Sequence, residues 1–191
     1  MKHKTLLAKL TMLVLLAAVL AGCSGLGKPA FHGEVYKPTE LAADINMPDQ
    51  NGNTFQLSKQ HGKIVLVFFG FLNCPDECPL TMTHLKQALE MLGDNSKNVQ
   101  VVLVSTDPVR DTPQAMKAYL ANFNPTFLGI TGTKDQLQKI WEDYGVMVLD
   151  GGETHSAYTY VIDQSGNLRL ALSPEMNPDE IAADLEILLS E

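Results

Sequence analysis

Two predominantly apolar runs constrain the fold of this chain more than any other feature. They cover residues 64–69 (IVLVFF) and 99–104 (VQVVLV), and both are rich in β-branched side chains. Runs of this kind predict strands that are buried on both faces of a sheet. Between them, residues 79–92 repeat leucine at helical spacing, which predicts a helix. A buried strand, a helix and a second buried strand indicate an α/β domain.

The rest of the chain continues this pattern of short strands and amphipathic helices. The further predicted elements are a β-hairpin over 45–57, a helix from 112 to about 122, a short strand over 127–130, a helix from 133 to about 144, strands over 157–162 and 167–172, and a helix from 177 to 189. Thr112 and Thr133 are the predicted N-caps of their helices. The order predicts a mixed central sheet with helices on both faces and an N-terminal β-hairpin.

The N-terminus has the pattern of an export signal. Three lysines precede residues 10–21, a run of 12 residues in which only a threonine is polar. A membrane-spanning helix needs about 20 apolar residues, so this run is typical of a cleaved signal peptide. The run ends in LAGC, which resembles the bacterial lipobox, and Cys23 is then the lipidated residue. We therefore predict a lipoprotein signal peptide over 1–22, a tether over 23–42 and one folded domain over 43–191.

The charge balance excludes several classes of partner. The chain carries a net charge of −8, with 14 basic and 22 acidic residues. Removal of 1–22 takes away three lysines, so the remainder has 11 basic and 22 acidic residues, a net charge of −11. Nucleic acids and anionic lipid surfaces select basic proteins, so neither is an expected partner. A hydrophobic content of 45% with 19% charged residues excludes disordered and multi-span membrane proteins.

Two of the three cysteines remain for chemistry once Cys23 is assigned to lipid. Cys74 and Cys78 lie in the sequence CPDECP, where the first buried strand turns into the first helix. Ligands of open sheets bind beyond the carboxyl ends of strands, and a helix N-terminus stabilises a thiolate. Cysteines four apart in a helical turn have Cβ atoms about 5–6 Å apart, which suits a shared metal ion better than a disulfide. The spacing still allows a redox-active or a purely structural disulfide.

A metal held by two thiolates needs a further ligand, and His155 is the candidate. The other histidines lie in the signal peptide, in the tether, before the first strand and on the first helix. His155 follows the flexible pair Gly151-Gly152 and precedes the predicted strand over 157–162. Thiolates with an imidazole suit copper or zinc. On the residues alone, a loop histidine without a metal role is the favoured interpretation.

A second polar cluster follows the second buried strand, over 107–113 (DPVRDTP). Helix capping and turn formation explain Asp111, Thr112 and the second proline. They do not explain Asp107 with Arg110. If the two buried strands are parallel, these side chains lie at the same sheet edge as the cysteines, and an ion pair or a turn is the simplest interpretation.

The three motifs together resemble the Sco/SenC family. They are 74–79 (CPDECP), 107–113 (DPVRDTP) and 154–156 (THS) leading into 160–163 (YVID), and the resemblance runs from about 43 to 189. It implies a thioredoxin-like fold and one copper ion, Cu(I) or Cu(II), bound by Cys74, Cys78 and His155. It also implies that Asp107 lies beside the ligands or faces the partner. Members of the family commonly have Asp before this histidine, where this chain has Thr154.

The resemblance further implies a role in building the dinuclear copper site of cytochrome c oxidase subunit II. The chain would donate copper, reduce the cysteines of that site, or do both, with a copper donor and a thiol reductant as further partners. It would be a copper chaperone rather than a conventional enzyme. Two alternatives remain: a membrane-tethered thiol–disulfide oxidoreductase without metal delivery, in which the redox pair Cys74 and Cys78 is catalytic, and a redox or copper sensor.

Overall fold

The computed structural model of the chain describes residues 30–149 and 158–191. The chain divides into an N-terminal unit, Met1–Ala30, and a domain, Phe31–Glu191. The predicted signal peptide, the lipidation site Cys23 and the predicted ligand His155 lie outside the described residues. Within the described part of the chain, no helix is long and apolar enough to cross a membrane.

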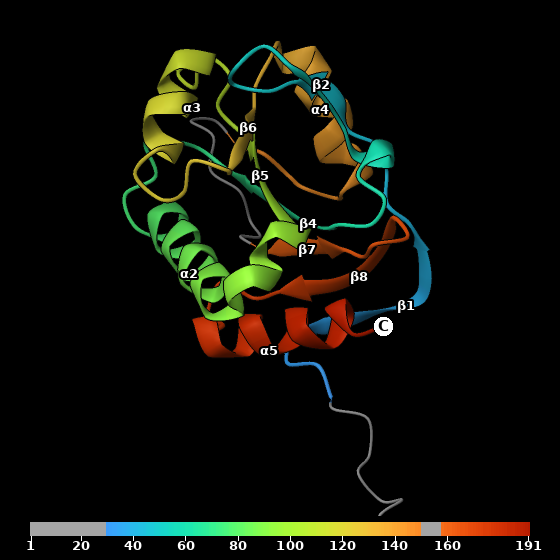
Figure 1. Ribbon diagram of the computed structural model, residues 1–191. Coiled ribbons are helices and arrows are strands. Elements are labelled where there is room, and N and C mark those ends of the chain that lie inside the picture. The colour runs from blue at the N-terminus through green and yellow to red at the C-terminus, as the bar shows by residue number, and fades with distance from the viewer. Residues whose placement is uncertain (1–29, 150–157) are drawn as a thin grey trace, which may run out of the picture. The chain divides into compact units, whose positions relative to one another are not determined.

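A six-stranded mixed sheet forms the centre of the domain, in the order β1-β8-β7-β4-β5-β6 (Figure 1). Its strands are β1 (Glu34–Leu41), β4 (Ile64–Gly70), β5 (Val99–Ser105), β6 (Leu128–Ile130), β7 (Thr159–Ile162) and β8 (Asn167–Leu172). Neighbours β4, β5 and β6 are parallel, whereas β7 and β8 join as antiparallel strands. The predicted hairpin is present as β2 (Asn46–Pro48) and β3 (Thr54–Gln56).

Helices cover both faces of this sheet, as the alternation of strands and helices predicts (Figure 1). The helices are α2 (Glu77–Leu92), α3 (Pro113–Leu120), α4 (Lys134–Asp143) and α5 (Pro178–Leu189), with short 3-10 segments η2 (Leu57–Lys59) and η3 (Gly93–Asn98). Thr112 and Thr133 cap α3 and α4 through their side chains, as predicted. Asn177 and Glu180 form a capping box at the start of α5.

The strand β4 supplies side chains to two separate apolar cores. Ile64, Leu66 and Phe68 pack in one cluster with α2, α3 and α5. The intervening Val65 and Phe69 pack in the other, with α4 and the β2–β3 hairpin. Every residue of β4 is buried. An unbroken apolar run is therefore required at this position, because neither face of the strand meets water.

The predicted tether over 23–42 is wrong for its last part, because Glu34–Leu41 form the edge strand β1. This strand pairs antiparallel with β8, and every one of its side chains is exposed. Backbone hydrogen bonds hold it in place, so its sequence (EVYKPTEL) carries no apolar alternation that would reveal a strand. The folded domain therefore begins before the predicted residue 43.

Candidate metal centre

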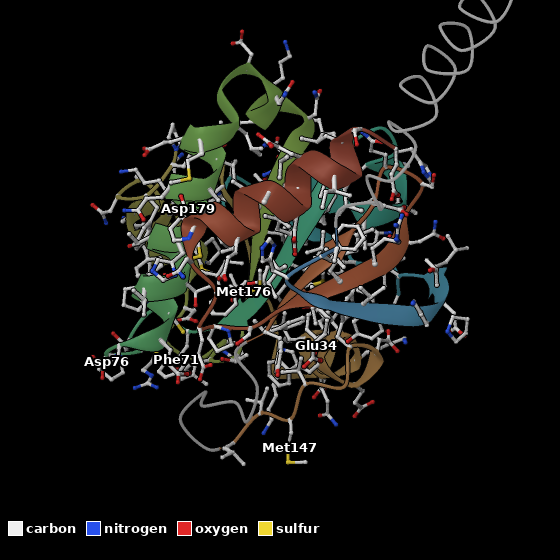
Figure 2. All side chains as sticks on the ribbon, turned by 90° about the horizontal axis from the view of Figure 1, so that it is seen from below. Glu34, Phe71, Asp76, Met147, Met176 and Asp179 are labelled. Atoms are coloured by element: carbon white, nitrogen blue, oxygen red, sulfur yellow. The ribbon has the colours of Figure 1, made fainter. Side chains whose placement is uncertain are left out.

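The two cysteines lie where β4 leads into α2, at the carboxyl edge of the parallel strands. Cys78 is buried with 6% exposure, and Cys74 is partly buried. Both are free thiols, and the Cys78 amide N–H donates a hydrogen bond to the Cys74 sulfur at 3.3 Å. Figure 2 labels Phe71 and Asp76, which bracket Cys74 in the connecting loop and lie at the same end of the domain.

The helix begins two residues earlier than the sequence predicts. Asp76 is the N-cap and Glu77 is the first residue of α2, so Cys78 lies in the first turn. Pro79 is the third helical residue and is still tolerated, because the first amides of a helix have no intrahelical acceptor. Both sulfurs therefore belong to one helix start, which the sequence does predict.

Gly70, the last residue of β4, gives Cys78 the room it occupies. A Cβ atom at Gly70 would lie 2.8 Å from the Cys78 sulfur and 2.8 Å from the Phe68 ring. Side-chain carbons do not approach a sulfur so closely without displacement. The glycine therefore allows the thiol to pack directly over the end of the strand.

Burial dominates the protonation of Cys78 in the metal-free protein. It raises the pKa of this thiol well above its ordinary value, and a hydrogen bond from the Phe71 backbone only partly opposes the shift. The Cys74 side chain and the Glu77 carboxylate raise the pKa further. The sequence predicts a thiolate stabilised by the helix dipole, so the structure differs here. A metal ion that binds Cys78 must displace a proton.

The segment between β4 and α2 that carries Cys74 is called the cysteine loop. The loop after β5 lies beside it, as the parallel arrangement predicts. Gly70 pairs with Ser105 in the register of β4 and β5, and the Thr106 amide donates to the Gly70 carbonyl at 2.9 Å. Asp107 is 7% exposed and forms an ion pair with Arg110. The structure thus brings Asp107 to the predicted edge, and its carboxylate is engaged there by an arginine.

Asp111 ties the two loops together, a role that the sequence analysis missed. Its carboxylate is fully buried, accepts the Ser105 hydroxyl at 2.7 Å and accepts the Leu72 amide at 3.2 Å. Burial raises the pKa of Asp111, although these hydrogen bonds oppose the shift. One feature of the sequence could have indicated this role. Thr112 already serves as the N-cap, so the acidic residue before it has no capping role.

Tyr119 on α3 is a second residue that the sequence analysis missed. Its ring packs against the apolar cluster that contains Cys78, with the Phe123 ring centroid 5.1 Å away. Burial raises the pKa of Tyr119, with smaller contributions from the ionisable groups of Cys78, Cys74 and Asp111. Nothing in the sequence distinguishes this tyrosine from an ordinary core aromatic.

The described histidines have other contacts. His84 is within 3.1 Å of the Met176 carbonyl, and His32 is 2.9 Å from Asp184. In residues 30–149 and 158–191, no three His, Cys, Asp or Glu side chains are grouped to hold a metal ion. The described part of the site is therefore a pair of thiols, and the assignment of His155 as third ligand stays a prediction.

Comparison with known proteins identifies the family. The family described as SCO1/SenC matches residues 34–190, beginning at the first residue of β1, and the chain belongs to this family. A SCO2-like protein of Rickettsia conorii is 32% identical over 151 residues, 74% of each chain.

Solved structures of Sco proteins share the fold. Apo Sco1 of Thermus thermophilus is 35% identical with a TM-score of 0.74, covering 84% of this chain and 98% of its own. ScoI of Bradyrhizobium japonicum, solved with copper bound, is 31% identical with a TM-score of 0.69, covering 78% of this chain and 100% of its own. The fold is thioredoxin-like, as the sequence motifs imply.

Proposed function

We propose that this chain is a membrane-tethered, extracytoplasmic copper protein that serves the dinuclear copper site of cytochrome c oxidase subunit II. It binds one copper ion through Cys74, Cys78 and His155, and it delivers the ion, reduces the cysteines of the target site, or does both. The observation that carries the proposal is the pair of free thiols at the start of α2 in a chain of the SCO1/SenC family. The copper-bound ScoI structure supports the choice of metal.

The donor set fits copper chemically. Thiolate sulfur is a soft ligand that favours Cu(I), and an added imidazole also accommodates Cu(II). Cys78 lies in the first turn of α2 over Gly70, and Cys74 in the loop just before the helix accepts the Cys78 amide N–H through its sulfur. When bound, copper supplies a transferable ion. The residues supply two thiolates, one buried and one accessible.

The difference in exposure between the sulfurs indicates how a partner is engaged. Cys74 is partly exposed, whereas Cys78 is buried beneath the loop. A partner thiolate therefore approaches copper from the Cys74 side. In the reducing role, Cys74 attacks a partner disulfide, and Cys78 then attacks the mixed disulfide. Two electrons and two protons pass to the partner, and a Cys74–Cys78 disulfide remains for an external thiol reductant.

Copper binding is tested on the reduced full-length chain purified in detergent. We expect one copper ion per chain, with X-ray absorption showing two sulfur ligands and one nitrogen ligand. Cys74→Ala and Cys78→Ala should each abolish tight binding in competition with a chelator. Full affinity in either variant would eliminate this site, and His84→Ala serves as a control because His84 contacts the Met176 carbonyl.

A thiol–disulfide oxidoreductase without metal delivery is the second candidate. The hydrogen bond from the Cys78 amide to the Cys74 sulfur favours it, because that contact stabilises an attacking thiolate at the exposed position. His155→Ala separates the two functions. Under the oxidoreductase role, the variant should reduce a model disulfide at the wild-type rate. Under the copper role, it should lose Cu(II) binding more than Cu(I) binding.

Membrane tethering through lipidated Cys23 completes the proposal. Cys23→Ala should leave copper binding intact while the protein leaves the membrane fraction or keeps its signal peptide. Fractionation with copper analysis of both fractions tests this. Loss of copper binding in the variant would contradict the separation of anchor and domain.

A further inference from the structure

A hollow in the surface lies between the edge strand β1 and the end of α4. Its volume is about 340 Å³, at the small end of the range for ligand pockets. The polar and aromatic residues that line it are Tyr36 and Glu40 from β1, Asp143 and Tyr144 from the end of α4, and Tyr160 from β7. The other described lining residues are apolar, and none of them is basic. The hollow therefore combines aromatic rings with carboxylates.

The aromatic wall of the hollow is preformed. The Tyr144 hydroxyl donates to the Ala43 carbonyl at 2.9 Å, and the Tyr160 hydroxyl donates to the Tyr144 carbonyl at 3.0 Å. The centroids of these two rings are 5.4 Å apart, with an angle of 69° between the ring planes. Because both hydroxyls are engaged, each ring is held in one orientation. Tyr36 is 36% exposed, so its ring is open to a ligand.

The two carboxylates of the hollow are open to a cation from outside. Glu40 is exposed, and no described residue forms an ion pair or a hydrogen bond with its side chain. Asp143 pairs with Lys139 at 2.7 Å, but the lysine side chain is 75% exposed. Exposed pairs of this kind are weak, so Lys139 can leave Asp143 at little cost. The hollow thus presents negative charge beside aromatic rings without a firmly held cation.

A guanidinium group fits this combination better than an ammonium group does. A cation over a tyrosine ring is attracted by the negative face of the ring. The guanidinium of arginine is planar and weakly hydrated, so it stacks on rings and donates two parallel hydrogen bonds to a carboxylate, whereas the lysine ammonium is a strongly hydrated point charge. The net charge of the chain, −8 in full and −11 without residues 1–22, also attracts a basic protein.

We propose that this hollow binds the guanidinium group of an arginine on a basic partner protein. The guanidinium lies against the tyrosine rings and donates hydrogen bonds to Glu40 and Asp143. Tyr144 and Tyr160 belong to the core on the α4 side of the sheet.

The thiols belong to the other core. Cys78 is part of the cluster that α2, α3 and α5 form, and Cys74 packs against it. A partner held at the hollow therefore leaves the cysteine loop uncovered. The chain can hold one protein there while its thiols serve another.

The test is a titration of the reduced full-length chain in detergent with a short neutral peptide that carries one arginine. NMR of ring-labelled tyrosine follows binding. We expect the Tyr36 and Tyr160 resonances to shift with a dissociation constant on the order of 1 mM, the scale for one bound side chain. The same peptide with citrulline, which keeps the shape without the charge, should leave them unshifted. Equal shifts with both peptides would overturn the inference, and equal affinity for a lysine peptide would overturn the choice of arginine.

Two variants locate the binding site. Glu40→Gln and Tyr36→Ala should each weaken binding of the arginine peptide roughly fivefold, the scale of one exposed ion pair or one cation–ring contact. Glu175→Gln is the matched control, because it removes the same charge from the loop before α5 and Glu175 does not line the hollow. Equal losses in Glu175→Gln and Glu40→Gln would mean that net charge alone attracts the peptide, and the inference would be wrong.

Copper affinity separates this inference from the proposed function. Both hollow variants should bind copper as the wild-type chain does, because no cysteine lines the hollow. A loss of copper affinity in either variant would contradict two separate sites. A wild-type chain that binds the arginine peptide but no copper would overturn the proposed function and leave this inference standing.

Discussion

Two fully buried aspartates, Asp111 and Asp184, perform the same task in different parts of the domain. Asp111 joins the cysteine loop to the end of β5, and Asp184 on α5 joins the chain entering β1 to the body of the domain. Both carboxylates have 0% exposure. Each therefore replaces lost hydration with hydrogen bonds from segments distant in sequence.

The two carboxylates differ in how fully they are satisfied. Asp184 accepts the His32 amide at 2.9 Å, the His32 imidazole at 2.9 Å and the Gly33 amide at 2.8 Å. Asp111 accepts one hydroxyl and one amide, the latter at 3.2 Å, and burial raises its pKa. The hydrogen bonds of Asp184 thus hold the chain entering β1 tightly, whereas those of Asp111 hold the cysteine loop more weakly. A weaker hold on the cysteine loop fits the proposed copper role, in which this loop takes up and releases an ion.

The largest effect is expected from Asp184→Asn. The substitution turns one carboxylate oxygen into an NH₂ group that faces backbone N–H donors. A backbone N–H cannot become an acceptor, so two donors then face each other. We expect the free energy of unfolding to fall by about 2–4 kcal/mol, the range for leaving buried charge-assisted hydrogen bonds unmade. Urea titration measures the change, with Asp94→Asn on the exposed η3 segment as control. A loss below 0.5 kcal/mol, within the usual range for surface substitutions, would show that the two carboxylates do not differ as described.

The second prediction places a methyl group at the cysteine loop through Gly70→Ala. The added Cβ would lie 2.8 Å from the Cys78 sulfur, so the thiol must move. We expect a loss of about 1–3 kcal/mol in stability, typical of overpacking, together with weakened copper binding. Gly129→Ala is the matched control, because its Cβ would meet the Leu120 side chain at 2.9 Å, and its three nearest atoms include no cysteine sulfur. The control should lose stability and keep copper affinity, and equal copper losses in both variants would contradict a local effect.

Asp111→Asn should be nearly neutral, in contrast to Asp184→Asn. The Ser105 hydroxyl can rotate and accept from the new amide group, while the remaining oxygen still accepts the Leu72 N–H. Burial already raises the pKa of the Asp111 carboxyl, so removal of its charge offsets any remaining loss of hydrogen-bond energy. We expect a stability change within about 1 kcal/mol by urea titration.

Asp111→Ala removes both hydrogen bonds of that carboxylate. Hydrogen exchange at the Leu72 amide should then accelerate, whereas it should stay slow in Asp111→Asn. Equal exchange in the two variants would mean that the carboxylate does not hold the cysteine loop.

The same contrast shows what the sequence can and cannot predict. The buried strands β4 and β5, the caps Thr112 and Thr133 and the cysteines at a helix start are all encoded locally, and the structure confirms them. The strand β1 is not encoded locally, because backbone pairing and the distant Asp184 hold it while its own side chains face water.

The chemistry of the site shows the same limit. The role of Asp111 depends on its contact with Leu72, a residue distant in sequence. The pKa direction of Cys78 was predicted wrongly, because the sequence gives the helix dipole but does not give the depth of burial that outweighs it. His155 as ligand and Cys23 as anchor remain predictions.

The smallest expected effect is a pH dependence of stability that arises from the contact between His32 and Asp184 at the start of β1. The hydrogen bond between the His32 imidazole and the Asp184 carboxylate, which accepts it, is the largest cause that raises the pKa of His32. Burial opposes the shift, and the charges of Asp184 and Glu180 make smaller contributions that raise it. A group whose folded-state pKa is raised stabilises the fold below its unfolded pKa of about 6.5, and this contribution disappears as the pH rises through the folded value. Above that pH the imidazole is neutral on both sides of the unfolding transition and adds no proton-linked stability.

His32→Gln tests this linkage, because glutamine can still donate to Asp184 but does not titrate. We expect the difference in melting temperature between wild type and variant to be larger at about pH 5.5 than at about pH 8.5, on either side of the histidine range. His61→Gln is the control, since His61 lies near Gly166 and not beside Asp184. A difference that stays constant with pH, or grows toward alkaline pH, would show that the His32–Asp184 contact is not linked to protonation. The anchor of β1 would then depend on the backbone donors of His32 and Gly33 alone.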